Sequence, residues 1–341
     1  MDSSLSTDTR VSAISFSAGK WEYFKLWIVN LVLTVVTLGI YSAWAKVRNT
    51  QYLYGHTQIE GHRLQYLATP MQLLKGRLIA LVLFIIYMLS SAFMPLVAAL
   101  LALVVMFATP YLMVKGLQFS LRHTAYRNVR FGFTGSIGGA YMNFMLLPLL
   151  GVLSLGLAMP WVIFRTSHYI YNNILFGKHE FEADLSVKTF YKAGLIAFAL
   201  FMVPVVLLFV MGMQAMSAAG GPPLGMVFAS YVLFFVAFSV FHVIIRNHIM
   251  NGLSARNLVS FRSDLQIGRY LGVMASNALI VVFTLGLGFP VAQVRMNKLL
   301  ADATEVHLTP EVDRLVASSS ELDSAFGEEM SGFFDADLSI T

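Results

Sequence analysis

Seven apolar segments alternate with polar connections along the 341-residue chain. Most reach the roughly 20 residues that a membrane-spanning helix needs. Two connections, around residues 92–95 and 217–223, are short and uncharged, which is typical of the turn in a helical hairpin. The pattern predicts an all-α polytopic membrane protein whose segments have the rough limits 24–45, 78–92, 96–114, 141–164, 193–216, 224–245 and 270–294.

The remaining connections carry basic residues and stretches that are alternating or rich in aromatic residues, bounded by glycine. Alternation of apolar and polar residues indicates β-strands. Short β-like strands that cap the helical body are therefore expected in these connections, at residues 13–17, 57–66, 129–134, 174–185 and 258–263.

Part of the chain recurs within itself. Residues 16–80 align without a gap on residues 133–197, and a shorter third copy follows the first at an offset of 247 residues. A unit that is used several times points to a modular architecture. The sequence thus predicts a membrane domain over residues 24–301 with an approximately threefold internal repeat, whose copies lie at about 16–132, 133–262 and 263–301.

Each copy carries a Leu-Gly pair in the last part of its first apolar segment and places an arginine nine residues after the glycine. Glycine permits a bend and proline removes a backbone hydrogen bond, so each motif predicts a break at membrane depth. Either the aromatic and arginine side chains anchor the segment ends at the membrane interface, or the broken ends line a binding cavity. The candidate residues are Gly39, Trp44, Arg48, Gly156, Pro160, Trp161, Arg165, Gly286, Pro290 and Arg295, with Asn30 and Asn277 as amides expected to bond between helices.

Composition and charge indicate a membrane protein with a basic surface. Only 12% of the residues are charged, against about 25% in soluble domains. Residues 302–341 hold ten acidic residues and one arginine, so the other 301 residues carry a net charge of +14. A basic body of this kind predicts membrane lipids rather than nucleic acid as partners. Residues 1–23 form a polar N-terminal segment, and residues 302–341 are expected to form an acidic, disordered tail with one short helix near 310–316.

Candidate chemistry is sparse. No Asp or Glu lies inside an apolar segment, which argues against a proton relay. His56, Glu60 and His62 lie close together, as do acidic residues and a histidine in 179–184, but the first group shares only one histidine with its aligned copy. Because the chain also lacks cysteine and any catalytic signature, we expect no enzyme, no metal site and no cofactor.

Four stretches of the chain resemble the YjgN family of bacterial inner-membrane proteins. They are Thr37-Leu-Gly-Ile-Tyr-Ser-Ala-Trp-Ala-Lys-Val-Arg48, Leu74-Lys-Gly-Arg-Leu-Ile79, Val129-Arg-Phe-Gly-Phe133 and Arg246-Asn-His-Ile-Met-Asn-Gly-Leu-Ser254. The likeness covers roughly residues 14–300, although the family commonly has proline where this chain has Ala43. It implies a multi-pass protein of the bacterial cytoplasmic (inner) membrane. The family is a domain of unknown function, so the resemblance supplies no active residue.

Two topologies are compatible with the sequence. If all seven segments span, the two halves are inverted, and lysine and arginine divide 11 to 12 between the sides, which gives no orientation signal. If segments 24–45, 141–164 and 270–294 enter and leave on one face, all 23 basic residues fall on one side. The length of the uncharged segments slightly favours seven spans.

Two functions follow from these topologies. Broken segment ends around a path favour an integral inner-membrane protein that transports a small or amphipathic molecule. Basic connections on one face favour a non-transporting membrane module that organises lipids or a partner complex.

Overall fold

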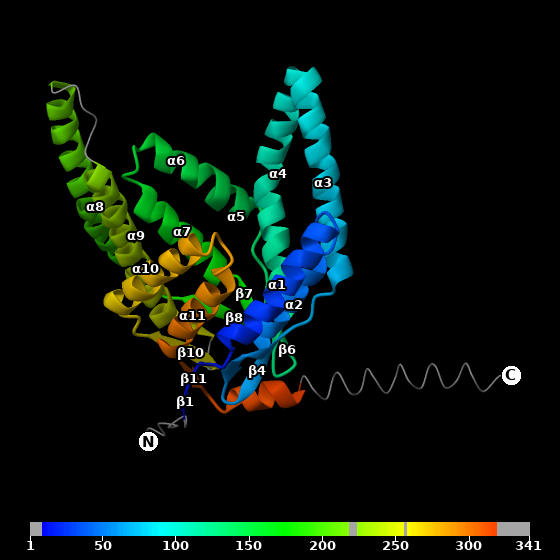
Figure 1. Cartoon of the computed structure of the whole chain (residues 1–341). Helices are drawn as coiled ribbons and strands as arrows, with labels where there is room; N and C mark the ends of the chain where they lie inside the picture. The colour runs from blue at the N-terminus through cyan, green and yellow to red at the C-terminus, as the bar shows by residue number, and fades with distance from the viewer. Residues whose placement is uncertain (1–8, 218–223, 256–257, 319–341) are drawn as a thin grey trace, which may run out of the picture.

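The computed structural model of the chain describes residues 9–217, 224–255 and 258–318. It has eleven short strands interleaved with helical hairpins, as Figure 1 shows. The helices are α1 Lys20–Val36, α2 Ser42–Gly55, α3 Pro70–Phe93, α4 Pro95–Arg122, α5 Ile137–Tyr141, a π-helical turn Met142–Leu146, α6 Leu147–Leu153, α7 Met159–Tyr171, α8 Val187–Ser217, α9 Leu224–Gly252, α10 Ile267–Phe283 and α11 Phe289–Asp302. The strands are β1 Arg10–Ala13, β2 Ser15–Phe16, β3 Thr57–Ile59, β4 His62–Tyr66, β5 Thr124–Tyr126, β6 Val129–Phe133, β7 Ile174–Phe176, β8 His179–Ala183, β9 Leu253–Ala255, β10 Val259–Ser263 and β11 Thr304–Leu308.

All eleven strands belong to a single sheet that nearly closes into a barrel. The order is β1-β11-β10-β9-β8-β7-β6-β5-β4-β3-β2, and the pairs described are antiparallel. The two edge strands, β1 and β2, are separated in the sequence by Ile14 alone, whose amide donates to the carbonyl of Thr304. The chain itself therefore joins the two edges, which leaves little exposed edge.

Five helical hairpins leave this sheet and return to it. In Figure 1 the hairpins rise from one side of the strands. Each hairpin contacts the next around the ring, through α2 with α3, α4 with α5, α7 with α8 and α9 with α10, and α11 contacts α1 to complete the circuit. The hairpins thus share one base.

The hairpins have two lengths. Helices α3, α4, α8 and α9 are long and apolar enough to cross a membrane. The second arms of the other three hairpins, α2, α7 and α11, have 14, 13 and 14 residues. At 1.5 Å per residue each of these arms is about 20 Å long, which is shorter than the roughly 30 Å hydrocarbon core of a bilayer.

The prediction of an all-α protein with seven spanning segments is wrong. Within the described part of the chain, four helices qualify as candidate spans, and segments 24–45, 141–164 and 270–294 instead belong to bent hairpins that return to the sheet. The strands expected as local caps are present, but they join edge to edge into the eleven-stranded sheet. A strand pair of three to five residues has marginal stability alone, so each pair gains by bonding to its neighbours.

The interior of the sheet is apolar, and a C-terminal helix covers its end away from the hairpins. Buried side chains inside the sheet come from most strands: Tyr126, Val129, Phe176, Phe181, Ala183, Leu253, Ala255, Leu258, Val306 and Leu308. Residues 311–318 are helical, and Val312 is buried against this cluster. The short helix predicted near residues 310–316 is thus present at 311–318. Residues 304–308, predicted as part of a disordered tail, instead form β11, because their apolar side chains complete the core. The rest of the predicted tail, after residue 318, and residues 1–8 of the N-terminal segment lie outside the described residues.

Candidate functional site

The tips of the three short hairpins have the same backbone geometry. Leu38, Leu155 and Leu285 adopt φ angles of 50°, 53° and 51°, and the glycine after each has φ of 91°, 88° and 90°. The amide of each glycine donates to a carbonyl five residues earlier, over 2.7–2.9 Å. This is the bond that closes a helix C-terminus when the chain turns through the left-handed region.

A hydroxyl residue before each leucine holds the turn from both sides. The Thr37 hydroxyl donates to the Leu33 carbonyl at 2.7 Å and accepts the Tyr41 amide at 2.9 Å. Ser154 and Thr284 make the corresponding two bonds in their hairpins. Each turn is thus fixed by local bonds alone and needs no contact with another hairpin.

The leucines in these turns are strained and have few protein contacts. A left-handed conformation costs a non-glycine residue about 1–2 kcal/mol. Leu38, Leu155 and Leu285 are nevertheless 94%, 93% and 93% exposed. Packing within the protein does not compensate for this strain, whereas burying a leucine side chain in an apolar medium stabilises by about 1.5–3 kcal/mol. Three exposed apolar tips are therefore suited to contact with lipid.

Within the first short hairpin the candidate residues form one chain of hydrogen bonds. Buried Asn30 donates to Asn49 at 2.8 Å and accepts from the Tyr41 hydroxyl at 3.3 Å. Arg48 donates to the same hydroxyl at 2.8 Å. Trp44 stacks on Tyr41 with ring centroids 6.1 Å apart. The bonds join the two arms of the hairpin, and Arg48 keeps an exposed side.

The third short hairpin uses the same residue types in a different arrangement. Asn277 donates to the Ala292 carbonyl at 3.0 Å and accepts from Arg295 at 2.9 Å. Arg295 also donates to the Ser276 hydroxyl at 2.7 Å. Pro290 is fully buried near the start of α11. Here the arginine itself links the arms.

The middle hairpin departs from this pattern. Asn143, rather than the aligned Leu147, supplies the buried amide, which donates to the Gly139 carbonyl at 2.8 Å within the π-helical turn. Pro160 lies against α8, because a Cβ on Gly194 would approach its Cγ to 2.8 Å. Trp161 is half-buried and Arg165 is exposed.

The candidate residues lie in three separate groups. Gly39, Gly156 and Gly286 lie at three different tips, and the arginines lie midway along the second arms. Among the described residues, no hydrogen bond connects the candidate residues of one short hairpin with those of another. The sequence motif thus marks three hairpins whose candidate residues bond within each hairpin and not between hairpins.

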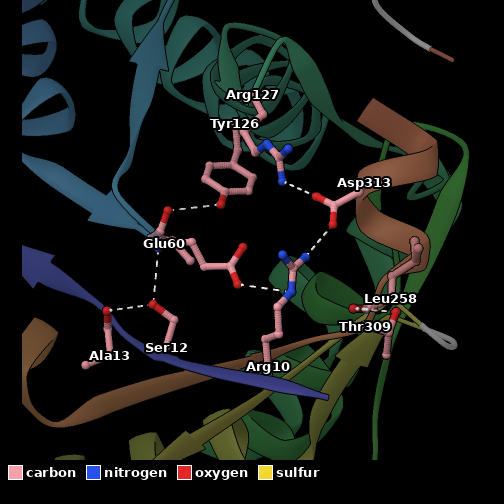
Figure 2. A network of polar contacts seen from close by, with 10 residues as sticks. Arg10, Ser12, Ala13, Glu60, Tyr126, Arg127, Leu258, Thr309 and Asp313 are labelled. Atoms are coloured by element: carbon pink, nitrogen blue, oxygen red, sulfur yellow. Dashed lines mark hydrogen bonds and ion pairs between the residues drawn. The ribbon is translucent and has the colours of Figure 1, made fainter. Parts of the chain in front are cut away.

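At the other end of the molecule, charged side chains hold the C-terminal helix on the sheet. Figure 2 shows Asp313 between two guanidinium groups. Its carboxylate accepts from Arg10 and from Arg127, each at 2.6 Å, and Arg10 also pairs with Glu60 at 3.4 Å. The hydrogen bond from Arg127 and the charge of Arg10 hold the pKa of Asp313 below its ordinary value. Burial raises the pKa of the neighbouring Tyr126 hydroxyl, which donates to the Ile59 carbonyl at 3.0 Å.

Sequence reasoning missed the role of Arg246. This half-buried side chain near the end of α9 donates to the Ser263 hydroxyl at 2.6 Å, the Thr304 hydroxyl at 2.8 Å and the Leu300 carbonyl at 3.1 Å. It therefore fastens a long hairpin to β10, β11 and α11. The available signal was its place as the first charged residue after the charge-free stretch 193–245.

Comparison with known sequences identifies the family. The family described as "Bacterial protein of unknown function (DUF898)" matches residues 11–333. The chain belongs to this family. Among its relatives, inner membrane protein YjgN of Salmonella typhimurium (strain LT2) is 26% identical over 88% of this chain and 90% of the relative.

A second relative agrees. Inner membrane protein YjgN of Escherichia coli O157:H7 is also 26% identical, over 81% of this chain and 83% of the relative. The resemblance stated from the sequence motifs is thus confirmed, and the names of the relatives support an inner-membrane location. No solved structure matches the chain.

Proposed function

We propose that the protein is a non-transporting module of the bacterial inner membrane, a repeat-built scaffold that inserts three short hairpins into one leaflet and organises lipids around them. The observation that carries this proposal is the strained, exposed leucine at each short tip. Lipid contact stabilises such a side chain, whereas a solute path would instead require polar groups from several hairpins to converge.

Charge distribution supports insertion from one side. Residues 78–114 and 193–245, which make up most of the long hairpins, contain no charged residue. The basic residues of these hairpins lie near their bases, for example Lys75, Arg77 and Arg122. Because all hairpins share one base, one orientation puts every described basic residue on or toward the same membrane surface, in agreement with the positive-inside rule. That surface would attract anionic lipid headgroups.

Cysteine accessibility tests the one-sided arrangement. The chain has no cysteine, so single replacements at Gln58, in β3, and at Lys178, in the turn between β7 and β8, give unique labels. We expect a membrane-impermeant maleimide to give the same result at both sites in intact cells, and the opposite result at both in inverted vesicles. Labelling of one site from each side would contradict the proposal.

A variant of the tips tests the lipid role. Asparagine tolerates the left-handed conformation, so replacing Leu38, Leu155 and Leu285 with asparagine keeps the turns and removes their apolar contact. In vesicles with spin-labelled anionic lipid, we expect fewer motionally restricted lipids per protein than with the wild type. Solute flux that Arg48→Gln and Arg165→Gln abolish, with insertion intact, would instead establish transport.

A further inference from the structure

A cavity of about 770 Å³ opens beside the base of the third short hairpin. It lies where β10 leads into α10 and where α11 leads into β11. Both signs of charge line it: Arg262 and Arg269 on one hand, and Asp264, Asp302 and Glu305 on the other. Among the described residues, none of these five side chains forms an ion pair or a side-chain hydrogen bond.

The ends of two helices add to this charge separation. Arg269 lies in the first turn of α10, whose N-terminus presents free amide groups and a partial positive charge. Asp302 is the last residue of α11, whose C-terminus carries a partial negative charge. The two arginines of the cavity therefore lie along β10 and α10, and Asp302 and Glu305 lie along α11 and β11. The third carboxylate, Asp264, lies in the loop between β10 and α10.

The loop of residues 263–265, which contributes Asp264 and Leu265 to the cavity, is held by hydrogen bonds from α9. Asn251 accepts the Ser263 amide at 2.6 Å, and Asn247 accepts the Leu265 amide at 3.1 Å. Asp264 lies between these two fixed residues, and its own amide donates to the Ala303 carbonyl at 3.0 Å. The carboxylate thus stands on a rigid backbone before any ligand arrives, which lowers the entropy lost on binding.

Polarity along the cavity changes in the direction of the membrane. Arg262 and Glu305 face each other across β10 and β11 and are exposed, whereas their neighbours Ser263 and Thr304 are buried. The charged pair therefore lies on the outer face of the sheet. Farther along the hairpin the lining becomes apolar, with Gly272, Val273 and Leu299. A cavity that is charged near the sheet and apolar farther along the hairpin matches an amphiphile whose headgroup lies toward the sheet.

We propose that this cavity binds a phosphate–ammonium zwitterion, with the phosphate at Arg262, Arg269 and the first amides of α10. The ammonium then lies among the three carboxylates, to which a primary amine can donate three hydrogen bonds. The polarity gradient assigns the group to the headgroup of phosphatidylethanolamine. Free phosphoethanolamine presents the same chemistry without the acyl chains. This inference rests on the proposed function and names the lipid class that one site would hold.

Lipid binding to the purified, delipidated full chain tests the site by native mass spectrometry. We expect phosphatidylethanolamine to bind at least about tenfold more tightly than phosphatidylglycerol, which has no ammonium, and phosphatidylcholine, which cannot donate from its nitrogen. Arg262→Gln with Arg269→Gln should remove this preference. Equal binding of the three lipids by the wild type would overturn the proposal.

A cavity-filling variant gives a test that leaves every charge in place. A Cβ on Gly272 would meet no atom within 4 Å, so Gly272→Phe fills the cavity without a clash at its Cβ. Ala278→Phe is the matched control, because Ala278 is exposed on another face of α10 and does not line the cavity. We expect Gly272→Phe alone to lose at least about tenfold in affinity for phosphatidylethanolamine. Equal affinity in the two variants would overturn the assignment.

Two further readouts separate the ligand sources and the two proposals. Competition by free phosphoethanolamine at the affinity of the lipid would confirm the zwitterion site and overturn its assignment to a headgroup. If the tip variants restrict fewer lipids but Gly272→Phe binds phosphatidylethanolamine normally, the cavity proposal fails and the proposed function stands. If labelling shows opposite sides for Gln58 and Lys178, the proposed function fails whatever the cavity binds.

Discussion

Asp313 shows how one side chain can couple the C-terminal helix to two distant parts of the sheet. Arg10 is the first residue of β1, and Arg127 lies in the turn between β5 and β6. The carboxylate bonds to both guanidinium groups, and its helix covers the apolar end of the sheet. The two arginines neutralise the carboxylate of Asp313, and the same helix packs the buried side chain of Val312 against the sheet.

Docking of this helix should depend on pH in one direction. The pKa of Asp313 is lowered in the folded protein, so its contribution is complete above the ordinary carboxyl pKa and is lost as the pH falls through the lowered value. We expect amide exchange in residues 311–318 to report constant docking above the ordinary carboxyl pKa and weaker docking as the pH falls below it.

Asp313→Asn should weaken docking even at neutral pH. Partly exposed ion pairs contribute roughly 0.2–1 kcal/mol each, so amide exchange in the helix should become a few-fold faster without global unfolding. Glu311→Gln is the matched control, because Glu311 is an exposed carboxylate on the same helix without a described ion pair. Equal exchange in the two variants would show that Asp313 does not hold the helix.

At the scale of elements, the short hairpins depend on a turn that their own residues encode. Gly156 has φ of 88°, and a Cβ there would meet no other atom within 4 Å. A substitution would therefore act through backbone strain alone. The preceding Leu155 already occupies the left-handed region, so the pair leaves no unstrained residue to absorb the change.

Gly156→Ala should destabilise the middle hairpin by about 1–2 kcal/mol. Thermal unfolding in detergent should report this loss, together with faster amide exchange in α6 and α7. Gly138→Ala serves as the control, since Gly138 is helical and a Cβ there also meets open space, so alanine there should be neutral or stabilising. A similar loss in both variants would refute the role of the positive φ.

These turns were predictable from the sequence, and the sheet was not. A Leu-Gly pair near a hydroxyl residue signals a local bend, because the residues that make it are neighbours. The pairing of β1 with β11, by contrast, joins residues about 300 positions apart, and strands of two to five residues carry no mark of their partner. Strand β11, Thr304–Leu308, was predicted as part of a disordered tail, because the acidic composition after residue 301 favoured disorder.

The candidate site was also predicted only where its residues are close in the sequence. The arginines and amides of the short hairpins were identifiable from their spacing, and the structure places Asn30 and Asn277 in bonds between hairpin arms. The charged cavity was not identifiable, because Arg262 and Glu305 become neighbours only through the pairing of β10 with β11. Segment length favoured seven spans because hydropathy counts apolar residues and does not register a reversal of direction.

On the scale of the whole molecule, the strands form one nearly closed ring and the hairpins form a second ring of contacts. Strands joined through Ile14 leave few free edges, and hairpins joined through α11 and α1 form a circuit above them. The end of the sheet away from the hairpins is covered by the helix of residues 311–318, as Figure 1 shows. This helix therefore completes a core to which most strands contribute.

Removing that helix should loosen the sheet and spare the hairpins. In a chain that ends at Thr309, the apolar side chains of Phe176, Phe181 and Val306 lose the cover of Val312, and exposing one large apolar side chain costs about 1.5–3 kcal/mol. We expect faster amide exchange in β7, β8 and β11 with normal membrane insertion. A chain that ends at Ser318 keeps the helix and is the matched control; identical exchange in the two chains would mean that the strand ring is stable without its cap.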